Sequence, residues 1–174
     1  MPQWLLGMST YAFESARRLI CAYTRNGSWQ LAEINLATDR LNVIETPYTD
    51  ISCLQASAGR TVFVGGSATE PTSIVQLDLA AQTFDVLRCS SRNKIDSGYI
   101  SIPEAIEFPT TQGQSSHAYF YAPQNKNCRA PAGDRPPLIV ISHGGPTAAA
   151  TASLNPAIQY WTSRGIAVLD VNYG

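Results

Sequence analysis

Charged residues are scarce in this sequence, and neither sign dominates. Of the 174 residues 14% are charged, with 12 Lys and Arg against 13 Asp and Glu, whereas about 25% is usual in soluble domains. A net charge of −1 provides no basic surface for nucleic acid or an anionic membrane. No apolar run approaches the ~18 residues of a membrane span, and the N-terminus lacks the basic start of a secretory signal. We therefore expect a cytoplasmic protein without nucleic-acid or membrane partners.

Cysteine and histidine are also sparse. The only histidines are His117 and His143, and the four cysteines lie far apart, at Cys21, Cys53, Cys89 and Cys128. No pair has the two-residue gap of a zinc knuckle or a redox motif. A disulfide framework would require a secreted protein. We therefore predict reduced thiols, no metal and no cofactor.

An internal repeat is the most informative feature that is present. Residues 34–44 align without a gap with residues 77–87 at a spacing of 43, and residues 18–23 match 60–65 at a spacing of 42. Turn residues such as Asn26-Gly27 separate short apolar runs. We place strands at 8–13, 18–23, 29–35 and 41–45 in the first copy, and at 51–57, 61–65, 73–78 and 83–88 in the second.

Four short strands in about 40–45 residues are typical of a β-propeller blade. Two similar hairpins in an ordinary sandwich are the alternative. Because a propeller needs roughly four to eight blades, we interpret residues 1–97 as the C-terminal blades of a larger propeller. The aromatic residues of these blades, including Trp29 and Tyr48, are expected to form blade core rather than a ligand cage.

The pattern changes after residue 97. Two strands are predicted at 104–108 and 117–121, and a continuous apolar run at 137–142 is typical of a buried parallel strand. Because Glu104 and Glu107 lie three apart on one of these strands, they face opposite sides and cannot act as a carboxylate pair.

A helix is predicted at 156–164. Asn155 is a suitable N-cap, Pro156 suits the first helical position and Gly165 suits the position after the helix. Its expected apolar face comprises Ala157, Ile158, Tyr160 and Trp161. Another apolar strand follows at 166–171, so strand, helix and strand predict a parallel βαβ unit. Residues 98–174 are therefore interpreted as the N-terminal part of an α/β domain.

The segment Ser142-His-Gly-Gly-Pro146 joins the strand to the helix. Two consecutive glycines allow a sharp turn that brings backbone N–H groups close to a ligand, and such groups can hold an oxyanion during acyl transfer. An ordinary strand-to-helix turn is one alternative. A phosphate loop is another, although neither a P-loop lysine nor a full GxGxxG motif follows.

The segments 138–146 and 159–174 resemble the prolyl oligopeptidase family of serine peptidases, in particular its dipeptidyl aminopeptidase and acylaminoacyl peptidase branch. Residues 103–109 are similar to the start of that family's hydrolase domain. The resemblance implies β-propeller blades followed by the start of an α/β-hydrolase domain, with both domains incomplete. It also implies that the Gly145 N–H contributes to the oxyanion hole, that Gly144 is a loop residue and that His143 has a supporting role.

The catalytic triad of that family has no counterpart in this sequence. No Gly-x-Ser-x-Gly nucleophile elbow occurs in the 174 residues, and in α/β-hydrolases the acid and the base follow that serine. We interpret Ser142 and Ser153 as residues of the strand end and the helix approach, and Asp170 as structural. His143 is not expected to be the catalytic base. The chain is predicted to be a fragment that is inactive alone.

The resemblance implies a serine exopeptidase that hydrolyses short peptides through an acyl-enzyme, with the propeller restricting access. The sequence indicates no oligomeric state. An esterase with an HGG oxyanion loop is one alternative. A propeller-type binding module or a degenerate pseudo-enzyme is another, although a complete chain of this kind would leave residues 166–171 as an uncovered apolar edge strand.

Overall fold

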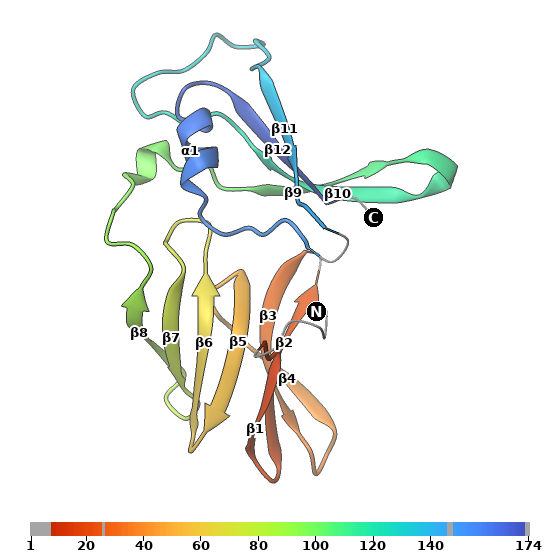
Figure 1. Ribbon diagram of the computed structural model, residues 1–174, viewed down its shortest axis with the longest axis vertical. Coiled ribbons are helices and arrows are strands. Elements are labelled where there is room, and N and C mark those ends of the chain that lie inside the picture. Colours follow the sequence, from red (N-terminus) through yellow and green to blue (C-terminus); the bar gives the residue numbers. More distant parts are fainter. Residues whose placement is uncertain (1–7, 26, 146–147, 173–174) are drawn as a thin grey trace. The chain divides into compact units, whose positions relative to one another are not determined.

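The computed structural model describes residues 8–25, 27–145 and 148–172 (Figure 1). Asn26, Pro146 and the segment 173–174, which the sequence analysis used, lie outside the described residues. The chain divides into two compact units, one up to Arg92 and one from Asn93. In the described part of the chain, no helix has the length and apolar character needed to cross a membrane.

The first unit consists of two antiparallel sheets, each with its four strands in chain order. This is the arrangement expected of propeller blades. The predicted strands agree except at 8–13, where the strand begins at Tyr11 and pairs with its neighbour as far as Ser15↔Arg18. The strands are β1 (Tyr11–Ser15), β2 (Arg18–Arg25), β3 (Ser28–Asn35), β4 (Arg40–Ile44), β5 (Asp50–Ser57), β6 (Arg60–Gly66), β7 (Ser73–Asp78) and β8 (Thr83–Cys89).

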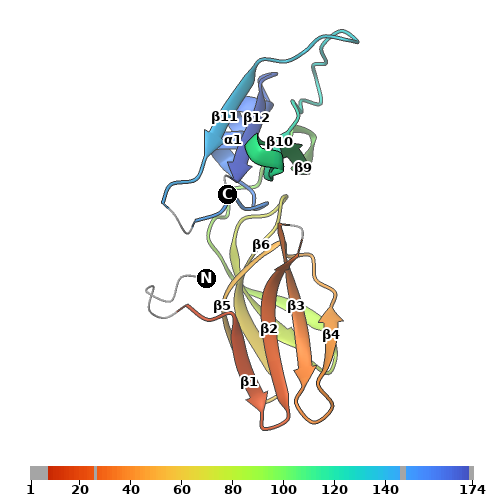
Figure 2. The same ribbon diagram turned by 90° about the vertical axis from the view of Figure 1, so that its right-hand side faces the viewer.

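The two sheets of the first unit lie face to face and share one apolar core (Figure 2). Ile20 and Leu31 of the first sheet and Phe63 of the second belong to this core. Tyr48 packs edge-to-face on Phe63 with ring centroids 5.5 Å apart, and Trp29 packs against the core while partly buried. The assignment of Trp29 and Tyr48 to the blade core is therefore confirmed.

In its described residues, the second unit contains a third four-stranded sheet, in the order β11-β12-β10-β9, and one α-helix. β11 and β12 are parallel with α1 between them in sequence, and the other two pairings are antiparallel. The elements are β9 (Glu104–Pro109), β10 (Ser115–Tyr121), β11 (Leu138–Ser142), α1 (Pro156–Thr162) and β12 (Ala167–Asn172), with short 3₁₀ helices at Ser97–Tyr99 and Thr111–Gly113.

The expectation that residues 166–171 form an uncovered edge strand is wrong. β12 lies inside the sheet because the β9–β10 hairpin pairs along its other side, for example at Ala118↔Val171. The edges of this sheet are β11 and β9.

The predicted start of the helix is confirmed, but of the predicted apolar face only Ile158 is buried. The Asn155 side chain accepts a hydrogen bond from the Ala157 N–H at 3.0 Å, and Pro156 follows it. The buried residues are Ile158, Gln159 and Thr162, whereas Ala157 is exposed, Tyr160 is 50% exposed and Trp161 is 41% exposed. A polar contact accounts for this rotation: Gln159 accepts from the Ser101 N–H at 2.7 Å and donates to the Ser101 carbonyl at 3.1 Å.

Candidate functional site

The glycine loop follows β11 at the carboxyl edge of the parallel pair, which is where ligands bind in open α/β sheets. Gly145 has φ of +71°, in the left-handed region that favours glycine. A Cβ added at Gly144 or Gly145 would meet no atom within 4 Å. The backbone conformation, rather than crowding, is therefore what requires glycine at position 145.

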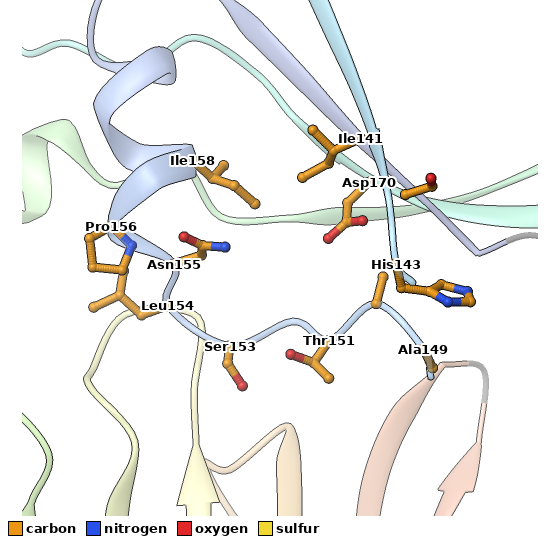
Figure 3. Close-up of a pocket in the computed structure, with 12 residues that line it drawn as sticks. Ile141, His143, Ala149, Thr151, Ser153, Leu154, Asn155, Pro156, Ile158 and Asp170 are labelled. Carbon is orange, nitrogen blue, oxygen red and sulfur yellow. The ribbon is translucent and has the colours of Figure 1, made fainter. Parts of the chain in front are cut away.

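A pocket of about 400 Å³ lies beside this loop and is formed entirely by the second unit (Figure 3). Its walls come from the end of β11, the segment 149–155, the first turn of α1 and β12. Figure 3 shows the side chains of Asn155 and Asp170 directed into the space between α1 and the sheet, whereas the His143 ring points away from it.

The segment that forms the floor of this pocket is fixed to the sheet. The Ala150 N–H donates to the side-chain oxygen of Asn172 at 2.8 Å. Ala150 and Ala152 are both buried in a cluster with Tyr119, Ile158 and Val168. Small residues therefore let this stretch of backbone lie close against the sheet and the helix.

Asp170 gives the pocket its charge. It stands beside Ile141 in the parallel register, which brings its carboxyl to the same end of the sheet as the glycine loop. Burial raises the pKa of Asp170, and the nearby His143 opposes this shift only in part. Burial also raises the pKa of Tyr121 on β10 to about 12, with a further contribution from the negative charge of Asp170.

The structure brings several of the sequence candidates together. Ser142, His143, Ser153 and Asp170 all line the same pocket, whereas Glu104 does not. Asp170, which the sequence predicts to be structural, is one of the residues that line this pocket. Aligning the ends of the two predicted parallel strands could have placed Asp170 in the pocket. In the register of these strands Ser142 pairs with Val171, so Asp170 lies beside Ile141, close to the start of the glycine loop.

The polar groups of the described residues include no cluster of three or more His, Cys, Asp or Glu side chains suited to holding a metal ion. The four cysteines are free thiols, of which Cys53, Cys89 and Cys128 are exposed. The pocket offers two serines, one histidine and one carboxyl group, and the glycine loop of Gly144 and Gly145 follows His143 beside the pocket without lining it. Such a loop is chemically suited to stabilising an oxyanion.

Solved structures of peptidases share this fold. A puromycin-hydrolysing peptidase of Mycobacterium tuberculosis matches 99% of this chain with a TM-score of 0.93 and 34% identity, over 27% of its own length. A serine-to-alanine mutant of puromycin hydrolase complexed with PGG matches 99% of the chain with a TM-score of 0.89 and 30% identity, over 26% of its length. An acylaminoacyl peptidase of Pyrococcus horikoshii matches 95% with a TM-score of 0.64 and 17% identity, over 24% of its length, which shows a shared fold alone.

These matches, with the two four-stranded sheets of the first unit, define the chain as a β-rich protein whose sheets have the form of propeller blades. The chain resembles a part of the peptidases of the prolyl oligopeptidase family, as its sequence predicts, and it spans about a quarter of their length. No model of a protein family and no curated protein sequence matches it.

Proposed function

We propose that this chain is part of a serine exopeptidase that releases residues from short peptides, and that its second unit is the start of the α/β-hydrolase domain. The observation that carries the proposal is the 34% identity and TM-score of 0.93 to a puromycin-hydrolysing peptidase over 99% of the chain. The β11-α1-β12 arrangement with a glycine loop after β11 agrees with it.

In the proposed mechanism a serine attacks the carbonyl carbon of the scissile bond, and a histidine takes the proton from its hydroxyl group. The tetrahedral intermediate collapses by expelling the amine, and water then hydrolyses the acyl-enzyme. These 174 residues contain no nucleophile elbow, so the serine and its partners are proposed to come from other residues. This chain contributes the Gly145 N–H, which donates to the oxyanion, while His143 orients the loop.

The blades have a separate role in this proposal. They restrict access to the active site of the complete enzyme, so that only short or unfolded peptides reach the serine. We propose that this enzyme works in the cytoplasm. The amide that links the amino acid of puromycin to its nucleoside is a bond of the same kind as the one attacked in an exopeptidase substrate.

The proposal is tested by measuring peptide and amide hydrolysis with the native gene product that contains these residues. We expect it to cleave fluorogenic aminoacyl and dipeptidyl amides and puromycin, and to cleave a protein-sized substrate much more slowly. Cleavage of simple esters without any cleavage of amides would instead make it an esterase and overturn the proposal.

The 174-residue chain alone provides the control for this assay. A fluorophosphonate probe of activated serines is expected to label it no faster than a denatured sample. Rapid labelling of the folded chain would contradict the proposal that the nucleophile lies outside these residues.

A further inference from the structure

The glycine loop of Gly144 and Gly145 belongs to a stretch of backbone without regular structure. Gly145 has a positive φ, and residues 148–154 form neither helix nor strand. Glycine has more backbone freedom than any other residue. The direction of the Gly145 N–H therefore depends on how the backbone is held before and after the loop.

Both of these attachments lie on β12. Before the loop, Ser142 at the end of β11 pairs with Val171 in the parallel register. After the loop, the Ala150 N–H donates a hydrogen bond to the side-chain oxygen of Asn172 at 2.8 Å. The backbone thus leaves β12 beside one residue and returns to it at the next.

Asn172 is itself held firmly. Its backbone carbonyl accepts a hydrogen bond from the hydroxyl of the buried Ser116 at 2.6 Å, and it pairs with His117 in the antiparallel register with β10. Side chains two apart on a strand point to the same side, so Asn172 shares the side of β12 from which Asp170 lines the pocket. Asn172 therefore connects the sheet to the segment that follows the glycine loop.

Apolar packing holds this segment less specifically. Ala150 and Ala152 are buried in a cluster with Ile158 and Val168, but a methyl group buries little apolar surface and its packing has no preferred direction. A hydrogen bond fixes both the distance and the direction of one backbone N–H. Because Ala150 is buried, loss of the acceptor would leave its N–H without a partner, and the segment would move to recover one.

We propose that Asn172 is a positioning residue for the oxyanion loop, which acts by holding Ala150 on β12 and thereby directing the Gly145 N–H. This inference rests on the proposed function, because it takes the Gly145 N–H as the donor to the oxyanion. Such a donor is effective only within hydrogen-bond distance of the oxygen that becomes charged. The role belongs to the acceptor oxygen of Asn172, not to its bulk.

Three variants separate the acceptor oxygen from the bulk of the side chain. Asn172→Leu keeps a similar size and removes the acceptor, whereas Asn172→Asp keeps an oxygen that accepts in either protonation state. Asn125→Leu is the matched control. Asn125 is another half-buried asparagine of the second unit that bonds to backbone, since it donates to the Ser163 carbonyl at 2.7 Å, but it does not line the pocket.

Kinetics of the native gene product on an aminoacyl amide test the positioning. Asn172→Leu should lower kcat at least about fivefold with KM within about twofold, because the oxyanion contact forms only in the transition state. A peptide aldehyde forms a tetrahedral adduct whose oxygen occupies the oxyanion hole, and its Ki should rise by a similar factor. The Ki does not depend on the fraction of folded enzyme. Asn172→Asp and Asn125→Leu should stay within about twofold in kcat and Ki.

Hydrogen exchange read by mass spectrometry measures the contact itself in the same protein. Peptides from residues 148–154 should exchange at least about tenfold faster in Asn172→Leu, because the protection of an amide falls when its hydrogen bond is lost. Asn172→Asp and Asn125→Leu should leave this exchange unchanged. Unchanged exchange in Asn172→Leu would overturn the inference.

The kinetic results can also overturn it. A normal kcat and Ki in Asn172→Leu would show that the loop keeps its position without Asn172, and equal losses in Asn172→Leu and Asn172→Asp would show that the acceptor oxygen is not the cause. If Asn172→Leu does not fold, Asn172→Ser replaces it, because the serine oxygen lies one bond closer to its own backbone; a normal Ki in that variant has the same meaning. An unchanged gene product that cleaves no aminoacyl amide would instead overturn the proposed function, and this inference with it.

Discussion

The two units of the chain bury different kinds of side chain. The first unit buries mainly apolar side chains, among them Phe63, Val75 and Leu77, and its buried polar residues are Thr61 and Ser73 in the described part of the chain. The second unit buries polar side chains at its centre, among them Gln159 and Thr162, and ties them to backbone groups. The two blades are held together by apolar packing together with hydrogen bonds such as that from the Gly59 N–H to the Glu14 carboxylate at 2.8 Å. In the second unit, the buried face of the helix is fixed by the contact of the Gln159 side chain with the Ser101 backbone.

Removing a large side chain from the apolar core should have the largest effect. Phe63→Ala is expected to lower the free energy of unfolding of the first unit by about 3–5 kcal/mol, because it leaves a cavity in a fully buried site. Hydrogen exchange read by mass spectrometry follows both units in one sample. Protection should fall across β1 to β8 and remain in β9 to β12.

The matched control for Phe63 is Cys21, which precedes it by 42 residues in the repeat. Cys21 is half-buried and lies between the core residues Ile20 and Ala22, on the side of the sheet that faces away from the core. Cys21→Ala should therefore cost less than about 1 kcal/mol. Equal losses for the two variants would contradict the assignment of the core to the inner faces of the sheets.

Breaking the contact between Gln159 and Ser101 should rank second. Gln159→Leu leaves the buried N–H and carbonyl of Ser101 without their partner, at a cost of about 2–3 kcal/mol to the second unit. Gln124→Leu also removes an amide that donates to a backbone carbonyl, that of Gly98 at 3.3 Å, but this contact is exposed. It should cost less than about 0.5 kcal/mol. The free energies of unfolding are measured by chemical denaturation. Equal losses for Gln159→Leu and Gln124→Leu would show that the contact between Gln159 and Ser101 does not determine which face of the helix is buried.

Asp170 of the second unit and Asp78 of the first should change the free energy of unfolding in opposite directions as the pH rises. Burial raises the pKa of Asp170, so the folded state binds its proton more tightly than the unfolded state, and its contribution to stability falls as the pH rises above the ordinary value of 3.8. Asp170→Asn should therefore remove a loss of stability that accompanies rising pH.

Asp78 of the first unit provides the opposite case. The backbone N–H groups of Ala81 and Ala80 lower the pKa of Asp78, so the stability it provides is present above pH 3.8 and is lost as the pH falls below that value. Asp78→Asn should therefore reduce the loss of stability that accompanies a fall in pH below 3.8. Thermal unfolding at several pH values checks both variants. For each one, the difference in stability from the unchanged chain is plotted against pH, and slopes of the same sign for the two variants would contradict these pKa directions.

The smallest expected effect comes from buried hydroxyl groups. Among the described residues, the Tyr121 hydroxyl in the second unit and the Thr61 hydroxyl in the first are buried without a hydrogen-bond partner. Tyr121→Phe and Thr61→Val keep most of the packing and remove an unsatisfied polar group, so each should leave stability unchanged or raise it by up to about 1 kcal/mol. A loss above about 1 kcal/mol, measured by denaturation, would show that the hydroxyl group has a partner in solution.

Local patterns predicted the elements of this chain well. Alternation and the two repeat spacings located the strands of the first unit, since each blade repeats the same pairing. Asn155 and Pro156 located the start of the helix, because capping depends only on neighbouring residues.

Local patterns could not predict the contacts between residues that lie far apart in the sequence. The buried face of α1 depends on Gln159 meeting Ser101, 58 residues earlier. The central position of β12 depends on the β9–β10 hairpin pairing beside it. The place of Asp170 in the pocket depends on the register of two parallel strands. Neither helical periodicity nor chain order contains this information.

Two glycines give the most direct test of the proposal that this chain supplies an oxyanion loop to a peptidase. Gly145 and Gly133 both have positive φ, of +71° and +91°, and an added Cβ at either would meet no atom within 4 Å. An alanine therefore imposes a similar backbone strain at both positions. The measurement is kcat and KM for an aminoacyl amide with the native gene product carrying either change. The account predicts that Gly145→Ala lowers kcat at least about tenfold with little change in KM, whereas Gly133→Ala stays within about twofold; equal kcat values for the two variants would contradict it.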